Sequence, residues 1–172
     1  MTVPFFSALL AFFYLILLLQ TTWISEIFPL FLKPDLMLVF VVYVGTRPYL
    51  LSGAALVGVC GLLYGLFSGS PGGLILLIYF ILFFLLKSLM KIILIGEALS
   101  VRLLLVLGAR VFQDLLIGVL PFVLGVVPTI TFPPGSWILA QAAITSLAGW
   151  PVWILFKKVE SLPLMTPLPK GE

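Results

Sequence analysis

Three polar residues, two of them oppositely charged, lie close together inside an otherwise apolar run. Arg110 and Asp114 are four residues apart, with Gln113 between them, so both charges fall on one face of a helix. A charge at the centre of a bilayer costs about 2.5–3.5 kcal/mol on insertion scales, and such residues therefore face the interior of a helix bundle with a partner. We expect Arg110 to be the partner of Asp114.

Three roles stay open for this intramembrane polar cluster, defined as Arg110, Gln113 and Asp114. It can be a structural pair that locks its helix against its neighbours, a contact to a helix of a partner protein, or part of a solute or proton pathway. Asp114 lies twelve residues beyond Arg102, which is about 18 Å along a helix and near the middle of a bilayer. A single carboxylate without a relay supports the third role least.

The rest of the chain offers little for enzymatic chemistry. It has no histidine and a single cysteine, Cys60, and we find no catalytic acid–base pair and no set of metal ligands. We therefore predict a protein that is not an enzyme and needs no cofactor. Asp35 follows Pro34, and this order is typical of a helix start, since proline suits the first turn and a carboxylate meets the positive end of the helix dipole.

The composition of the chain predicts that these residues lie on transmembrane helices. Hydrophobic residues make up 63% of the chain and charged residues 9%, which predicts an integral membrane protein. Four apolar segments are long enough, or nearly so, to cross a bilayer, and two are shorter, the weakest being 36–46. We expect an all-α membrane protein with short loops, a single domain over 1–158 and a disordered tail over 159–172. The six expected transmembrane helices are 5–20, 36–46, 49–67, 73–86, 103–124 and 136–156.

The basic residues predict the orientation of these helices. An even number of crossings separates the groups of lysines and arginines, so they fall on one side, which the positive-inside rule makes the cytoplasm. Lys33 alone is left on the outer face, and both termini are then cytoplasmic. The residues on the inner side are Arg47, Lys87, Lys91, Arg102, Lys157 and Lys158.

Glycines form a candidate packing face on the segment 49–67 and just beyond it. Gly58 and Gly61 are followed by Gly65 and Gly69, and the last three, at intervals of four, lie along one face of a helix. Small residues let helices approach closely in lipid, where packing drives association. Such a face can dock against another helix of the same chain or against a partner subunit, and both interpretations stay open.

Two stretches carry a motif-like pattern. In the first, a helix led by Pro34 and Asp35 is followed by the glycine-rich helix and a tight loop, and in the second a Trp-Pro-x-Trp sequence ends the last helix before two lysines. This arrangement resembles the MreD family of bacterial rod shape-determining membrane proteins. The positions that match are Pro34, Asp35, Ser68, Gly69, Ser70, Pro71, Trp150 and Pro151.

The resemblance implies a non-enzymatic scaffold subunit of the cell-elongation machinery in the bacterial inner membrane. Such a subunit binds MreC, here mainly through its transmembrane helix, and helps organise peptidoglycan synthesis through MreB, RodA and the transpeptidase partner of RodA. MreD proteins are similar in architecture to the S-components of energy-coupling-factor transporters, so the resemblance implies an S-component-like bundle. Membrane lipid is expected around it, and nucleic acid is not expected as a partner.

The same expected architecture is compatible with an alternative function in transport. A chain of this kind can be the substrate-binding S-component of an energy-coupling-factor vitamin transporter. Such a component needs a cavity with several convergent polar or aromatic groups. The candidates in this sequence, besides the intramembrane polar cluster, are Tyr43, Tyr64 and Tyr79.

Overall fold

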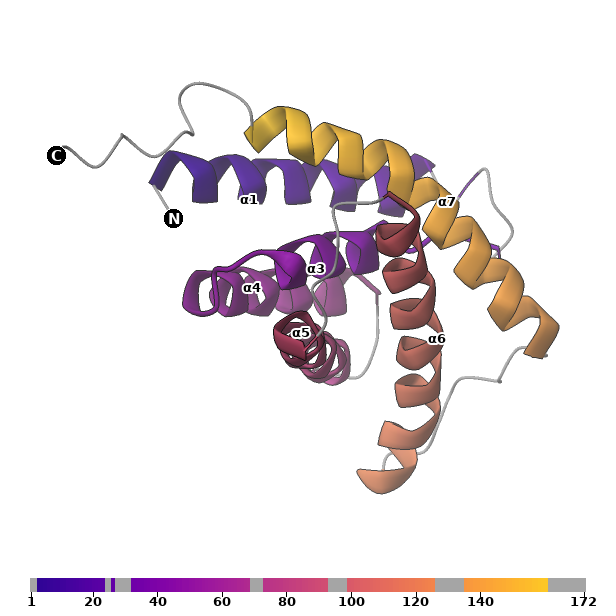
Figure 1. Cartoon of the computed structure of the whole chain (residues 1–172). Coiled ribbons are helices and arrows are strands. Elements are labelled where there is room, and N and C mark those ends of the chain that lie inside the picture. Colours follow the sequence, from indigo (N-terminus) through magenta and orange to yellow (C-terminus); the bar gives the residue numbers. More distant parts are fainter. Residues whose placement is uncertain are drawn as a thin grey trace, which may run out of the picture.

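The computed structural model describes residues 3–23, 26, 32–68, 73–92, 99–125 and 135–160 (Figure 1). Within these residues all regular secondary structure is helical, and each predicted apolar segment forms one helix. Gly69, Ser70 and Pro71 and the predicted tail beyond residue 160 lie outside the described residues. The elements are α1 (Val3–Leu18) with its π-helical continuation η1 (Leu19–Trp23), α3 (Leu36–Thr46), α4 (Leu51–Ser68), α5 (Leu74–Ile92), α6 (Leu99–Val123) and α7 (Gly135–Glu160).

Among the described residues, four helices are long and apolar enough to cross a membrane: α4, α5, α6 and α7. The chain is therefore a multi-pass membrane protein. Helix α1 has 16 residues and α3 has 11, so length and composition support four spans. The arrangement with six spans, and the cytoplasmic placement of both termini, stay predictions.

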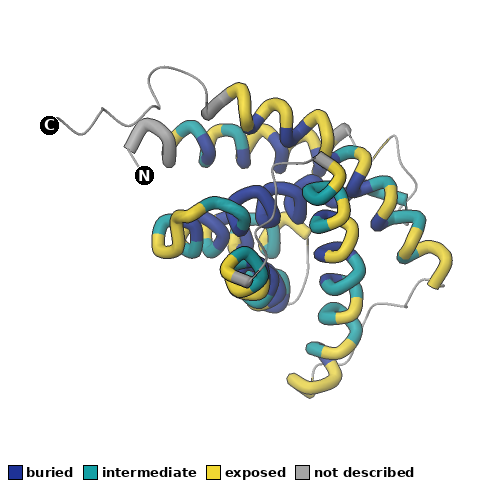
Figure 2. The backbone as a smooth tube through the Cα atoms, viewed as in Figure 1, coloured by how far each residue is buried: buried dark blue, intermediate teal, exposed yellow. Residues whose placement is uncertain are grey.

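The short helix α3 forms the centre of the molecule. Ten of its residues, Leu36 to Gly45, are buried, as expected for a helix that is apolar on every side. It packs against α1, α4, α5, α6 and α7, and Figure 2 shows it as a nearly continuous dark blue tube. The segment that is weakest as a membrane span is thus the core around which the longer helices pack.

Aromatic side chains join α1, α3 and α7. The ring of Phe156 stacks on Tyr43 with a centroid distance of 4.1 Å and meets Phe12 edge-on at 4.8 Å. Helices α1 and α7 accordingly lie side by side in Figure 1. Tyr43 also contacts Trp153 edge-on at 5.2 Å, so the Trp-Pro-x-Trp stretch of α7 reaches the core through its second tryptophan.

Part of the glycine face packs inside the chain. A Cβ atom added at Gly58 would lie 3.1 Å from the ring of Phe80, and one added at Gly61 would lie 3.1 Å from the Cα atom of Leu76. Both neighbours belong to α5, so these two glycines let α4 and α5 pack closely. Among the described residues, no atom lies within 4 Å of a Cβ added at Gly65, so this glycine stays open for the second interpretation, a partner subunit.

Basic residues that were predicted to share one side of the membrane are linked by contacts at the C-terminal end of α3. The Lys87 ammonium donates a hydrogen bond to the carbonyl of Arg47. The Arg47 guanidinium lies 4.7 Å from the ring centre of Tyr43, and that of Arg102 lies 5.2 Å from the ring centre of Trp153. Since Tyr43 and Trp153 touch each other, these cations gather around one end of the central helix.

Candidate functional site

The N-terminal end of α3 lies inside the protein, where its free N–H groups need partners. Asp35 is the N-cap, and its Oδ1 accepts a hydrogen bond from the N–H of Leu38 at 3.0 Å, which confirms the predicted helix start. The Oε1 of Gln20 accepts from the N–H of Met37 at 3.1 Å, and the Oγ1 of Thr145 accepts from the N–H of Asp35 at 3.1 Å. Polar side chains from η1 and α7 therefore meet at this end of α3.

The intramembrane polar cluster joins the same site through Arg110. Its Nη2 lies 2.8 Å from Oδ1 of Asp114, which confirms the predicted pair. Its Nη1 lies 3.2 Å from Oδ2 of Asp35, and Gln113 donates to the same oxygen at 3.0 Å. Asp35 and Gln113 are each 5% exposed and Arg110 is 7% exposed, so the network is buried.

One guanidinium thus pairs with two carboxylates that come from different helices. Asp35 leads α3, whereas Arg110 and Asp114 both lie on α6. Buried charges of this kind are tolerated because each one is paired and hydrogen-bonded, and removal of one partner leaves an uncompensated charge. The arrangement ties α6 to the end of the central helix.

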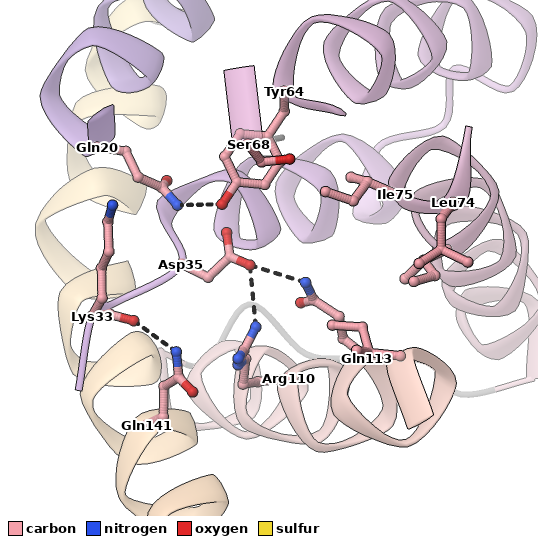
Figure 3. A pocket seen from close by; sticks show the side chains of 12 residues that line it. Gln20, Lys33, Asp35, Tyr64, Ser68, Leu74, Ile75, Arg110, Gln113 and Gln141 are labelled. Carbon is pink, nitrogen blue, oxygen red and sulfur yellow. Dashed lines mark hydrogen bonds and ion pairs between the residues drawn. The ribbon is translucent and has the colours of Figure 1, made fainter. Parts of the chain in front are cut away.

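A cavity of about 240 Å³ adjoins this network (Figure 3). Aliphatic side chains of α5 and α6 form one wall, and the other walls carry polar groups from η1, α4, α6, α7 and the segment that leads into α3. The polar residues that line it are Gln20, Lys33, Asp35, Tyr64, Ser68, Arg110, Gln113 and Gln141.

Most polar groups around the cavity form hydrogen bonds or ion pairs with other protein groups. The Tyr64 hydroxyl accepts a hydrogen bond from Gln20 Nε2 at 3.0 Å, and Gln141 Nε2 donates to the carbonyl of Lys33 at 3.0 Å. The Oε1 atom of Gln113 is buried and has no partner among the described residues. A buried carbonyl of this kind calls for a hydrogen-bond donor, and a water or a polar solute in the cavity would supply one.

The size of the cavity limits what it can hold. A volume of 240 Å³ is below the range of about 300–1,000 Å³ that is usual for drug-sized ligands, and it corresponds to several waters at about 30 Å³ each. Both carboxylates are paired with Arg110, and the unpartnered Oε1 of Gln113 is suited to a small hydrogen-bond donor. Within the described ranges there is no group of three or more His, Cys, Asp or Glu residues that could hold a metal ion.

The three predicted tyrosines do not converge on one place. Tyr64 lines the cavity, and Tyr79 stacks beside it with a ring-centroid distance of 6.1 Å. Tyr43 lies at the other end of α3, against Trp153 and Arg47. Two of the three therefore belong to the site or its immediate surroundings.

The positions of the motif-like pattern also separate in space. Pro34 and Asp35 are buried at the site, and Ser68 lines the cavity at the end of α4. Trp150 and Pro151 lie on the exposed side of α7, where Trp150 is 51% exposed. The two halves of the pattern therefore do not form a single site.

Sequence reasoning missed several members of the site. Gln20, Thr145 and Gln141 hold the end of α3 and the chain before it, and the link from Asp35 to Arg110 joins residues 75 positions apart. The available signal was that Gln20 and Gln141 are amides within or beside apolar segments, where an uncompensated polar group is costly. Helical periodicity gives no information on which helix such an amide meets.

No protein-family model, curated protein or solved structure matches the chain. Its functional interpretation therefore depends on the sequence resemblance and on the geometry described above.

Proposed function

We propose that this chain is a non-enzymatic, multi-pass subunit of the rod-shape machinery in the bacterial inner membrane, and that it binds MreC there in the manner of MreD. The observation that carries the proposal is the distribution of polar and apolar side chains between the inside and the outside of the protein. The buried polar network faces the inside, whereas the outer faces of α4 and α6 are apolar, with Leu66 79%, Leu104 70% and Phe122 84% exposed. Such a protein offers partners the surfaces of its helices.

One of these surfaces has the geometry that a partner helix needs. On α4, Gly65 has open space beside it, and Leu62 and Leu66 next to it are 52% and 79% exposed. Apolar surface alone does not drive helices together in lipid, so close packing at a small residue is the favourable contact. We propose this face, Leu62, Gly65 and Leu66, as the contact for the transmembrane helix of MreC.

The test uses a rod-shaped host that lacks its own copy of the gene and carries wild type, Gly65→Leu or Gly108→Leu. Gly108, on α6, likewise has no neighbour within 4 Å of an added Cβ in the described part of the chain, so it is a matched control. We expect the Gly65→Leu protein to lose MreC in pull-down and its cells to be wider than wild type. The Gly108→Leu protein should recover MreC, and its cells should have the normal width. Equal MreC recovery with both variants would exclude the α4 face, and a normal shape without the gene would exclude the function.

The cavity supports a second candidate function, a small-solute-binding S-component. Its support is the polar lining and the unpartnered Oε1 of Gln113. If this function is correct, a vitamin from a ligand panel will raise the melting temperature of the purified protein, and Gln113→Leu will remove that shift. A panel that leaves the melting temperature unchanged argues against it.

A further inference from the structure

A second cavity, of about 500 Å³, lies at the opposite end of α3 from the polar network. It is formed where α3 ends, where α4 begins and where α5 ends. Three cationic side chains line it, Arg47, Lys87 and Lys91, and among the described residues none of those that line it is acidic. The cavity therefore concentrates positive charge.

Two of these cations are held in place by the protein. Lys87 donates to the carbonyl of Arg47. Arg47 donates to the Tyr43 hydroxyl at 3.1 Å and lies over the ring of that residue. Groups that are already restrained lose less conformational entropy when they bind a ligand, so this arrangement is prepared for an anion. Lys91, exposed in the last turn of α5, completes the group.

The remaining wall of the cavity is mostly apolar and open. Leu50 and Phe84 line it and are 53% and 50% exposed, and the neighbouring Leu51 is 88% exposed. A cationic mouth that continues into an apolar wall suits an amphiphile with an anionic head and a hydrocarbon tail. A free inorganic anion would use only the cationic part.

The depth of the cavity agrees with such a ligand. Helix α3 ends at Thr46, α4 begins at Leu51 and α5 ends at Ile92, so the cavity lies where three apolar helices end, at the level of lipid headgroups. Basic pockets between membrane helices on the cation-rich side bind anionic lipid headgroups. We propose that this cavity binds an anionic phospholipid, with its phosphate between Arg47, Lys87 and Lys91 and an acyl chain along Leu50 and Phe84.

The test measures lipid binding to the purified protein in non-ionic detergent by native mass spectrometry. Phosphatidylglycerol and phosphatidylcholine with the same acyl chains are the two ligands. We expect phosphatidylglycerol to bind at least about tenfold more tightly. Lys91→Gln should weaken its binding about fivefold, because one basic residue near an anionic lipid contributes about 1 kcal/mol, and should leave phosphatidylcholine unaffected. Lys91 is exposed, so this variant is expected to fold.

The matched control is Lys157→Gln combined with Lys158→Gln, two exposed lysines at the end of α7. It should leave phosphatidylglycerol binding unchanged, which separates the cavity from general surface charge. Equal affinity for the two lipids, or equal losses in the Lys91 variant and the control, would overturn the proposal. Displacement of phosphatidylglycerol by millimolar inorganic phosphate would also overturn it, because the cavity would then recognise phosphate alone.

Discussion

The two ends of helix α3 differ in how their charged side chains are placed. At its N-terminal end, Asp35 is buried, and the nearby Arg110 is shared between two carboxylates. At its C-terminal end, Lys87 contacts the carbonyl of Arg47 and Arg47 lies over the ring of Tyr43, and the described residues that line the adjoining cavity include no acid. Carboxylates and a guanidinium pair inside the protein at the first end, whereas cations line the cavity at the second.

From this difference we expect the charges at the N-terminal end of α3 to contribute to folding and those at the C-terminal end to contribute to binding. Buried ions must find partners within the fold, because an unpaired ion in an apolar environment is costly. Cations at the end of a membrane helix lie at the level of headgroups and water, where they attract anions. Substitutions at the two ends should therefore differ strongly in their effects on stability.

Arg110→Ala should have the largest effect on stability. It leaves the buried Asp35 and the half-buried Asp114 without this cation, so we expect a loss of about 3–5 kcal/mol in the free energy of unfolding. Denaturant titration in mild detergent measures it, with Lys91→Ala as the control at the cationic end. A loss of similar size in both variants would remove the distinction between the two ends.

Asp35 should be the next most sensitive position, and its two substitutions separate the cap from the charge. Asp35→Ala loses both, and we expect a loss of about 2–3 kcal/mol. Asp35→Asn keeps a side-chain oxygen for the N–H of Leu38 and should lose only about 1 kcal/mol. Equal losses in unfolding titrations would mean that the cap contributes little at this position.

Removing Asp114 and Arg110 together should restore stability only in part. If the two residues formed an isolated pair, Asp114→Ala combined with Arg110→Ala would recover most of the stability lost in the single variants. Because Asp35 also pairs with Arg110, the double variant should stay about 1–3 kcal/mol below wild type. Full recovery in a double-mutant cycle would show that the contact with Asp35 contributes little.

The smallest effect is expected for Lys91→Gln in the absence of anionic lipid. Lys91 is exposed at the end of α5, and we expect a change of less than about 0.5 kcal/mol in the unfolding free energy. Added phosphatidylglycerol should then stabilise wild type more than the variant. The same unfolding titration with and without the lipid provides the comparison, and an equal shift in both proteins would contradict it.

The sequence predicts the local features of both ends of α3 well. Apolar segments place the helices within a few residues, the interval of four pairs Arg110 with Asp114, and the Pro34–Asp35 order predicts the start of α3. Each of these features depends on neighbours in the chain, where helical geometry fixes the distance. The predicted segment 36–46 agrees with the helix Leu36–Thr46.

The contacts between helices could not be predicted in this way. The sequence identifies Asp35 only as a helix start, whereas the structure also buries it beside Arg110. The glycine interval predicted one continuous face, but Gly61 packs on α5 and Gly65 does not. Which helix faces which residue depends on the packing of the whole bundle, and a single sequence holds no local signal for it.

Because the polar network is internal and the cationic cavity lies at the helix ends, the proposed function places the partner contact on the apolar face of α4 at Gly65. The most direct test of the proposed function is purification of the tagged protein from native membranes in mild detergent, with the co-eluting proteins identified by mass spectrometry. The proposed function predicts recovery of MreC and of elongation synthases. Recovery of ATPase coupling subunits, or of a bound small molecule with no protein partner, would contradict it.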